Sequence, residues 1–101
     1  AAKAAMIAAS KHTGMAVAKD GVTVNSVAPG SILHAEGTWE KFINNNTPEA
    51  VAEFIDRNLP MGKFGWPEPI GSTVAFLSSQ QADLITGVCL NVDGGQSHNL
   101  F

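Results

Sequence analysis

The residues Val22–Gly30, with the sequence VTVNSVAPG, constrain the fold more than any other stretch of the chain. They are β-branched, small or neutral polar residues, a pattern typical of a strand covered on both faces, as in a parallel sheet. Pro29 and Gly30 end this strand over Val22–Ala28, because proline lacks the N–H of a ladder and glycine frees the next turn. Ligands of open α/β sheets bind beyond the carboxyl ends of the strands. We therefore expect a ligand at Pro29–Ile32, the alternative being a buried strand that merely ends in Pro-Gly.

A second buried strand is predicted over Thr86–Val92, with the sequence TGVCLNV, followed by the turn Asp93-Gly94-Gly95. Helices between the two strands imply a parallel pair with a crossover connection, which is normally right-handed. The alanine-rich segment Ala1–Lys19 predicts a helix with Gly21 as its C-terminal cap. Two strands alone rarely make a stable sheet, so the pattern indicates an incomplete α/β domain.

Three helices are predicted in the connection between the strands. The first carries an apolar stripe at residues 39, 42 and 43, with Thr38 as its N-cap. The second begins at Thr47-Pro48-Glu49, where a capping residue precedes a proline and an acid, and the third begins at Pro67-Glu68-Pro69. Because these segments lie on one long connection, we interpret them as a lid rather than a core.

Charge and residue usage exclude several classes of function. A net charge of −3 over 101 residues offers no basic patch for nucleic acid or an anionic membrane, and no apolar run approaches the roughly 20 residues of a membrane span. The only cysteine, Cys89, excludes an internal disulfide, fits a cytoplasmic protein and is interpreted as a buried small hydrophobe. His12, His34 and His98 share no ligand spacing, so no metal site is predicted.

Four segments, AAK, TVNSVAPGSI, LPMGKFGWPEPIGSTVAFLSS and ITGVCLNVDGG, occur in the order seen in short-chain dehydrogenases/reductases. The 26 residues from Lys3 to Pro29 match the usual separation between the lysine of Tyr-x-x-x-Lys and the Pro-Gly of that family. The chain most resembles members similar to 3-oxoacyl-carrier-protein reductase. The resemblance implies the C-terminal portion of a Rossmann-like doubly wound parallel sheet, with residues 1–101 forming a single partial domain.

The resemblance also implies a function, that of an NAD(P)-dependent oxidoreductase. Such an enzyme transfers a hydride between the nicotinamide of NAD or NADP and a small carbonyl or alcohol substrate, and is a homo-oligomer, a dimer or a tetramer. Lys3 would hold the nicotinamide ribose and lower the pKa of the catalytic tyrosine by its positive charge. Pro29, Gly30 and Ser31 would pass beside the nicotinamide, and Ile32 would offer its backbone to the carboxamide.

Four further residues are given two interpretations each. His34 stands where the family often has a threonine that faces the cofactor pyrophosphate, so it is either a cofactor contact or, as we favour, a loop histidine. Asn25 more plausibly supports the end of its strand than touches a ligand. Trp39 and Phe42 would line a substrate pocket or, as is more common for helix stripes, form plain core.

The resemblance leaves part of an active site unaccounted for. The catalytic tyrosine would stand four residues before Lys3, ahead of residue 1, and the chain contains no Tyr. The family's serine and its glycine-rich phosphate loop would also lie upstream, so we expect residues 1–101 to be an inactive fragment by themselves. The alternative is a truncated, non-catalytic remnant that acts only as an association module through its first helix and last strand.

Overall fold

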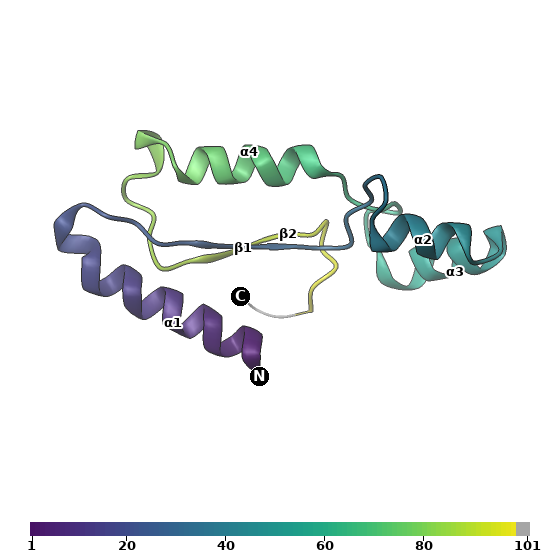
Figure 1. Ribbon diagram of the computed structural model, residues 1–101, viewed down its shortest axis with the longest axis horizontal. Coiled ribbons are helices and arrows are strands. Elements are labelled where there is room, and N and C mark those ends of the chain that lie inside the picture. Colours follow the sequence, from purple (N-terminus) through teal and green to yellow (C-terminus); the bar gives the residue numbers. More distant parts are fainter. Residues whose placement is uncertain (99–101) are drawn as a thin grey trace.

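Two short parallel strands form the centre of the computed structural model, which describes residues 1–98 (Figure 1). Strand β1 pairs with β2 from Ser26 opposite Cys89 to Pro29 opposite Val92. Helix α1 covers one face of the pair and α4 the other, while α2 and α3 lie beyond the carboxyl ends of the strands (Figure 1). The predicted parallel pair with a crossover connection is therefore confirmed. In chain order the elements are α1 (Ala2–Val17), the 3₁₀ turn η1 (Ala18–Asp20), β1 (Ser26–Pro29), α2 (Thr38–Asn44), α3 (Pro48–Asn58), α4 (Pro67–Leu77), the 3₁₀ turn η2 (Gln80–Ala82) and β2 (Cys89–Val92).

Both strands are shorter than the sequence predicts, because side chains replace ladder bonds at their amino ends. The amide of Val24 donates to Thr86 Oγ1 at 3.0 Å. Asn25 joins the same two segments, donating through Nδ2 to the Ile85 carbonyl at 3.1 Å and accepting at Oδ1 from the Val88 amide at 3.2 Å. The predicted supporting role of Asn25 is thus confirmed, although it acts at the start of the strand rather than at its end.

Pro29 lies inside β1 rather than after it, which corrects the predicted end of the strand at Ala28. The ladder tolerates this proline because the amide of Gly30 donates to the Val92 carbonyl at 3.1 Å, so no N–H of Pro29 is needed. The prediction of a fully buried strand is wrong for the described chain. Residues 26–28 are half-buried and Pro29 is exposed, since a two-strand sheet leaves both outer edges unpaired. Cys89 is a free, half-buried cysteine.

Helix α1 approaches the sheet closely at Gly14, its one buried residue. A Cβ atom on Gly14 would lie 2.9 Å from Thr86 Oγ1 and 3.2 Å from the backbone nitrogen of Gly87. The helix ends before the predicted Lys19, because the chain tightens into η1. The C-cap of α1 is Ala18, so the predicted cap, Gly21, ends the 3₁₀ turn with φ 77° and not the helix itself.

The connecting helices confirm most of the predicted boundaries. Thr47 caps α3, its Oγ1 accepting from the Ala50 amide at 3.1 Å, and α4 begins at Pro67. Thr38 is the first residue of α2 and not its cap, because Gly37 before it has the extended backbone of an N-cap. The lid interpretation is wrong for α4, which packs along β1 as a layer of the sheet, whereas α2 and α3 do lie beyond the strand ends (Figure 1).

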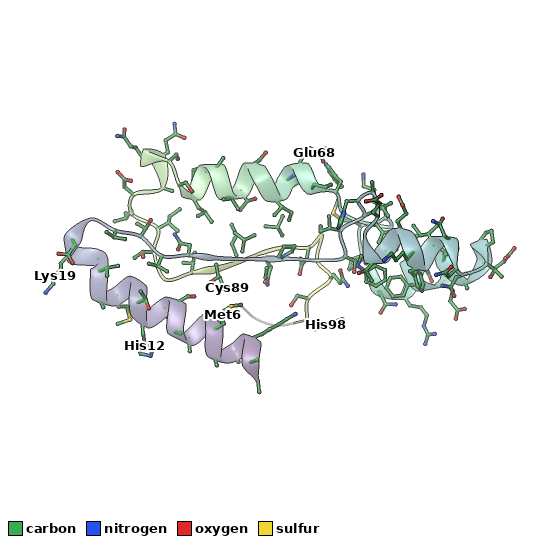
Figure 2. The ribbon with its side chains drawn as sticks, in the orientation of Figure 1. Met6, His12, Lys19, Glu68, Cys89 and His98 are labelled. Atoms are coloured by element: carbon green, nitrogen blue, oxygen red, sulfur yellow. The ribbon has the colours of Figure 1, made fainter. Side chains whose placement is uncertain are left out.

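Four aromatic rings hold the α2–α3 unit together. Trp39 contacts the rings of Phe42, Phe54 and Phe64 with centroid separations of 5.5, 5.0 and 5.4 Å. Phe64 is buried and the other three rings are half-buried, so these rings form a small core, as we favoured for Trp39 and Phe42, although Trp39 also lines a hollow beside the end of β1. By contrast, large apolar side chains on α1 remain open, since Met6 is 61% and Met15 64% exposed. Figure 2 labels Met6 on this helix. Within residues 1–98, no helix has both the length and the apolar character needed to cross a membrane.

Alanine at two helical glycines tests the close approach of α1 to the sheet. Gly14→Ala forces a methyl group against the bonded Thr86 hydroxyl and the Gly87 backbone, and overpacking of about 1–3 kcal/mol outweighs the gain in helix propensity. A Cβ on Gly71 in α4 meets no described atom within 4 Å apart from its chain neighbours and the backbone of its own helix, so Gly71→Ala should stabilise the protein by about 0.5–1 kcal/mol. We expect denaturant titrations of the full-length protein to show unfolding free energies that move in opposite directions. Equal changes in both variants would contradict this packing.

Candidate functional site

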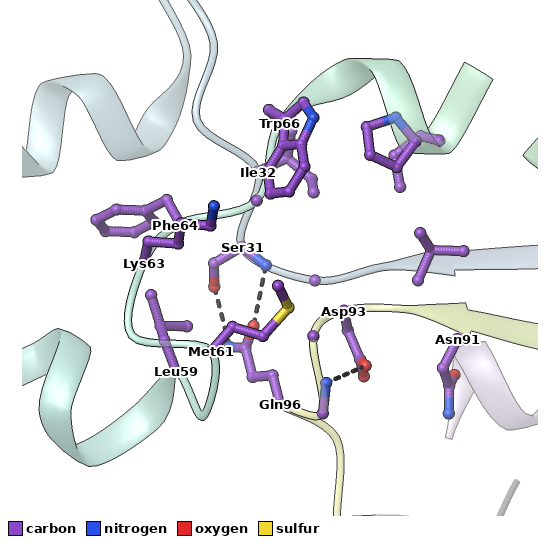
Figure 3. Close-up of a pocket in the computed structure, with 17 residues that line it drawn as sticks. Ser31, Ile32, Leu59, Met61, Lys63, Phe64, Trp66, Asn91, Asp93 and Gln96 are labelled. Atoms are coloured by element: carbon purple, nitrogen blue, oxygen red, sulfur yellow. Dashed lines mark hydrogen bonds between the residues drawn. The ribbon is translucent and has the colours of Figure 1, made fainter. Parts of the chain in front are cut away.

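The carboxyl ends of β1 and β2 lie side by side and bring two loops together. Gly30–Leu33 follows β1, and Asp93–Gln96 follows β2 at the same edge (Figure 3). Gly30 allows this contact, since a Cβ there would lie 2.8 Å from Asp93 Cβ and 2.9 Å from Gln96 Oε1. Gly30, the first residue after β1, therefore meets the end of β2 without space for any larger residue.

The backbone at Ser31–Leu33 is held against Gly65 in the connection before α4. The Gly65 amide donates to the Ser31 carbonyl at 2.9 Å, and the Leu33 amide donates to the Gly65 carbonyl at 2.9 Å. This isolated parallel bridge pairs Ile32 with Gly65. In such a bridge the neighbours of the bridging residue make the bonds, and its own N–H and C=O point the other way. The N–H and C=O of Ile32 accordingly bond to no group within residues 1–98.

Gln96 and Asp93 complete this edge, although the sequence predicts Asp93 only as part of a turn and gives Gln96 no role. The side chain of Gln96 binds Ser31 twice, accepting from the Ser31 amide at 3.0 Å and donating to Ser31 Oγ at 2.9 Å (Figure 3). Asp93 accepts at its two carboxylate oxygens from the amides of Gly95 and Ser97, both at 3.0 Å. The sequence Asp-Gly-Gly predicts a turn. No local pattern around Gln96 predicts its hydrogen bonds to Ser31, which lies 65 residues earlier in the chain.

Two hollows border the Gly30–Ile32 backbone. The Pro29 hollow, of about 710 Å³, is lined by Pro29, Gly30, Ile32, His34, Thr38, Trp39, Pro67, Ile70 and Gly71. The Met61 cavity, of about 390 Å³, is lined by Gly30, Ser31, Ile32, Leu59, Met61, Lys63, Phe64, Gly65, Trp66, Pro69, Ile70, Asn91, Val92, Asp93, Gly94, Gly95 and Gln96 (Figure 3). Both volumes fall in the range of about 300–1,000 Å³ that is usual for small-molecule sites.

The structure brings together most of the predicted site residues after β1. Pro29, Gly30, Ile32 and His34 all line the Pro29 hollow. Ser31 is buried and lines the Met61 cavity instead, with its amide and hydroxyl both bonded to Gln96. The predicted roles of all these residues toward a ligand stay predictions.

Lys3 lies apart from both hollows. It is exposed in the first turn of α1, and its side chain makes no hydrogen bond or ion pair with the part of the chain that the structure describes. Helix α1 runs antiparallel to β1, so its amino end is turned toward the edge at which the strands end (Figure 1). The arrangement leaves the Lys3 ammonium free to serve a ligand or a group beyond the described residues.

His34 is exposed at the rim of the Pro29 hollow. Its Nδ1 lies 3.2 Å from the Ala35 carbonyl, and its ring packs so closely over Gly37 that a Cβ there would meet it at 2.6 Å. His12 lies in α1 and His98 in the segment after β2 (Figure 2). No three His, Cys, Asp or Glu side chains gather into a possible metal site within the described ranges.

Comparison with known proteins adds a family to this geometry. Residues 1–97 match the family described as enoyl-(acyl carrier protein) reductase. The 3-oxoacyl-[acyl-carrier-protein] reductase FabG of Rickettsia bellii is 41% identical over 95 residues, which cover 94% of this chain and 36% of that relative. The 4-formylbenzenesulfonate dehydrogenase TsaC1/TsaC2 of Comamonas testosteroni is 38% identical over 96 residues, which cover 94% of this chain and 37% of that relative. The chain thus spans little more than a third of the length of these relatives.

Solved structures show the same partial overlap. YwfH, an NADPH-dependent reductase involved in bacilysin biosynthesis, superimposes with a TM-score of 0.83 at 31% identity, covering 96% of this chain and 38% of the other. A 4-hydroxyisoleucine dehydrogenase complexed with NADH superimposes with a TM-score of 0.81 at 35% identity, and the match again covers 96% of this chain and 38% of the other. The strands, their covering helices and the α2–α3 unit therefore belong to an arrangement that these larger enzymes contain.

Proposed function

The chain belongs to the short-chain dehydrogenase/reductase family, and from this membership we propose that it forms the nicotinamide-binding part of an NAD(P)-dependent oxidoreductase. Its parallel strands with helices on both faces are part of the Rossmann-type fold of that family. The observation that carries the proposal is the unpaired backbone of Ile32, which faces away from Gly65 beside an open hollow at the strand ends. Both a donor and an acceptor are thus held in place for a ligand.

A nicotinamide carboxamide fits this backbone in its chemistry. Its oxygen accepts one hydrogen bond and its NH₂ group donates, while the N–H of Ile32 donates and its C=O accepts. Pro29, exposed at the end of β1, and Gly30 would provide the wall beside the ring. When bound, the cofactor supplies the hydride that is exchanged with the substrate. The part of the chain after β1 then fixes the ring in one orientation, which decides the face from which hydride leaves.

Lys3 is proposed to act on the ribose and on the proton transfer. Its ammonium would hold the nicotinamide ribose hydroxyls and stabilise the phenolate of a tyrosine four residues earlier in the family pattern. The serine and the glycine-rich loop of that pattern would likewise come from preceding residues. Under this proposal residues 1–101 form the C-terminal part of one catalytic domain and are inactive by themselves.

The substrate is proposed only as a class, a small carbonyl compound or alcohol. One relative is named for a 3-oxoacyl group and another for 4-formylbenzenesulfonate, and both names denote a carbonyl. The solved structures are named with NADPH in one case and NADH in the other, so either cofactor is consistent with the family. Cys89, the only cysteine of the sequence, is free and suits a reducing compartment, so we propose a cytoplasmic enzyme.

A second candidate function, association without catalysis, is favoured by the open apolar surface of the described chain. Met6, Met15 and Leu90 are 61%, 64% and 42% exposed on α1 and β2. The same surface fits the proposed homo-oligomer, so exposure alone does not separate the two functions. Hydride-transfer activity that depends on Lys3 distinguishes the catalytic function from association without catalysis.

Lys3→Met in the full-length protein tests the proposed catalytic part. We expect the melting temperature to stay close to that of the wild type, because the Lys3 side chain is exposed and makes no hydrogen bond or ion pair in the described chain. Reductase activity followed by nicotinamide absorbance at neutral pH should fall by about two orders of magnitude or more, as for loss of general acid–base assistance. Lys19→Met, in the turn after the same helix, serves as the matched control and should retain activity. Near-normal turnover in the Lys3 variant would favour association without catalysis.

His34→Thr tests whether the imidazole contacts the cofactor. We expect the dissociation constant of the oxidised cofactor to change by less than about tenfold, or roughly 1.4 kcal/mol, because the ring already packs over Gly37 at the rim of the hollow. Fluorescence titration of the full-length protein measures this constant. A larger loss of affinity would place His34 in direct contact with the cofactor.

A further inference from the structure

We propose that Gln96 is a positioning residue for the nicotinamide site, acting through Ser31 on the backbone of Ile32. This inference rests on the proposed function and names the residue that holds its key backbone group in place. Gln96 lines the Met61 cavity and not the Pro29 hollow proposed for the nicotinamide, so it contacts Ser31 rather than the cofactor itself. Its action is therefore indirect.

The first step is the double hydrogen bond between Gln96 and Ser31. The Ser31 amide donates to Gln96 Oε1 at 3.0 Å, and Gln96 Nε2 donates to Ser31 Oγ at 2.9 Å (Figure 3). The planar side-chain amide of Gln96 thus hydrogen-bonds both the backbone and the side chain of Ser31. Ser31 is only 6% exposed, which makes each of these bonds costly to lose.

The second step is the turn that carries Gln96. The carboxylate of Asp93 accepts from the amides of Gly95 and Ser97, and the Asp93 carbonyl accepts from the Gln96 amide at 3.1 Å. Gly94 and Gly95 have φ of 60° and 86°, a backbone that favours glycine, so the Asp-Gly-Gly sequence suits this turn. The turn fixes Gln96 relative to the end of β2.

The third step passes from Ser31 to Ile32 through one planar peptide unit. The Ser31 carbonyl and the Ile32 N–H belong to the same plane and point in opposite directions. Gly65 holds the carbonyl at 2.9 Å, and Gln96 holds the amide and hydroxyl of Ser31 from the other side. Ser31 is therefore fixed at all three of its polar groups, and this fixes the direction of the Ile32 N–H.

Gln96→Ala in the full-length protein tests the inference with two probes, oxidised NAD(P) and ADP-ribose or its 2′-phosphate. ADP-ribose lacks the nicotinamide, so a positioning role predicts about tenfold weaker binding of the dinucleotide and binding of ADP-ribose within twofold of the wild type. Gln96→Glu keeps an acceptor for the Ser31 amide and lets the Ser31 hydroxyl donate to the second oxygen, so it should restore most of the affinity. Gln81→Ala, an exposed glutamine in η2, is the matched control.

Ser31→Ala provides a second, less disruptive variant, because it removes only the hydroxyl and leaves the amide of Ser31 bonded to Gln96. It should weaken dinucleotide binding by less than Gln96→Ala, and the double variant should be no worse than Gln96→Ala alone. Unchanged dinucleotide binding in Gln96→Ala, or an equal loss for both probes, would overturn the positioning role while leaving the proposed function intact. A wild-type protein that binds the dinucleotide no better than ADP-ribose and catalyses no hydride transfer would overturn both.

Discussion

The parallel pairing of β1 with β2 decides where the candidate site lies. Four residue pairs, from Ser26 with Cys89 to Pro29 with Val92, join segments more than sixty residues apart in the chain. Because parallel strands end at the same edge, this register puts the Pro-Gly loop next to the Asp-Gly-Gly turn. Gly30 lets the two backbones meet, and its amide adds one more bond to the ladder at the Val92 carbonyl. A shift of one residue in the pairing would move Gln96 away from Ser31 and leave the loop after β1 unsupported.

The loop after β1 is supported on two sides and open on the third. The Gly65 amide donates a hydrogen bond to the Ser31 carbonyl. The Gln96 side chain accepts from the Ser31 amide and donates to the Ser31 hydroxyl. The third side is the backbone of Ile32, which faces away from Gly65. Its N–H and C=O both lack a hydrogen-bond partner within residues 1–98. A rigid backbone with free polar groups at the end of a parallel sheet suits a ligand that carries an amide. The α2–α3 unit, held by its own aromatic rings, then forms a separate body beyond that edge (Figure 1).

Local sequence signals predicted the elements of this fold well, because their causes are local. Thr47-Pro48 and Pro67 begin helices through capping and fixed φ, and Gly21 ends the 3₁₀ turn after α1 by its left-handed backbone. The strand ends were predicted less well, since distant side chains, such as Thr86 against Val24, replace the ladder there. Pro29, Gly30, Ile32 and His34 were predicted together from a family resemblance and do share one hollow. Gln96 was missed because its meaning depends on a register that no local pattern encodes.

A crystal structure of the full-length protein with oxidised NAD(P) bound is the most direct test of the nicotinamide site. We expect the nicotinamide ring in the Pro29 hollow, its carboxamide within hydrogen-bonding distance, about 2.9 Å, of the Ile32 N–H or C=O. The Ser31–Gln96 bonds should persist unchanged in that complex. A ring bound in the Met61 cavity, or a carboxamide that leaves the Ile32 backbone unpaired, would contradict the assignment of this edge as the nicotinamide site.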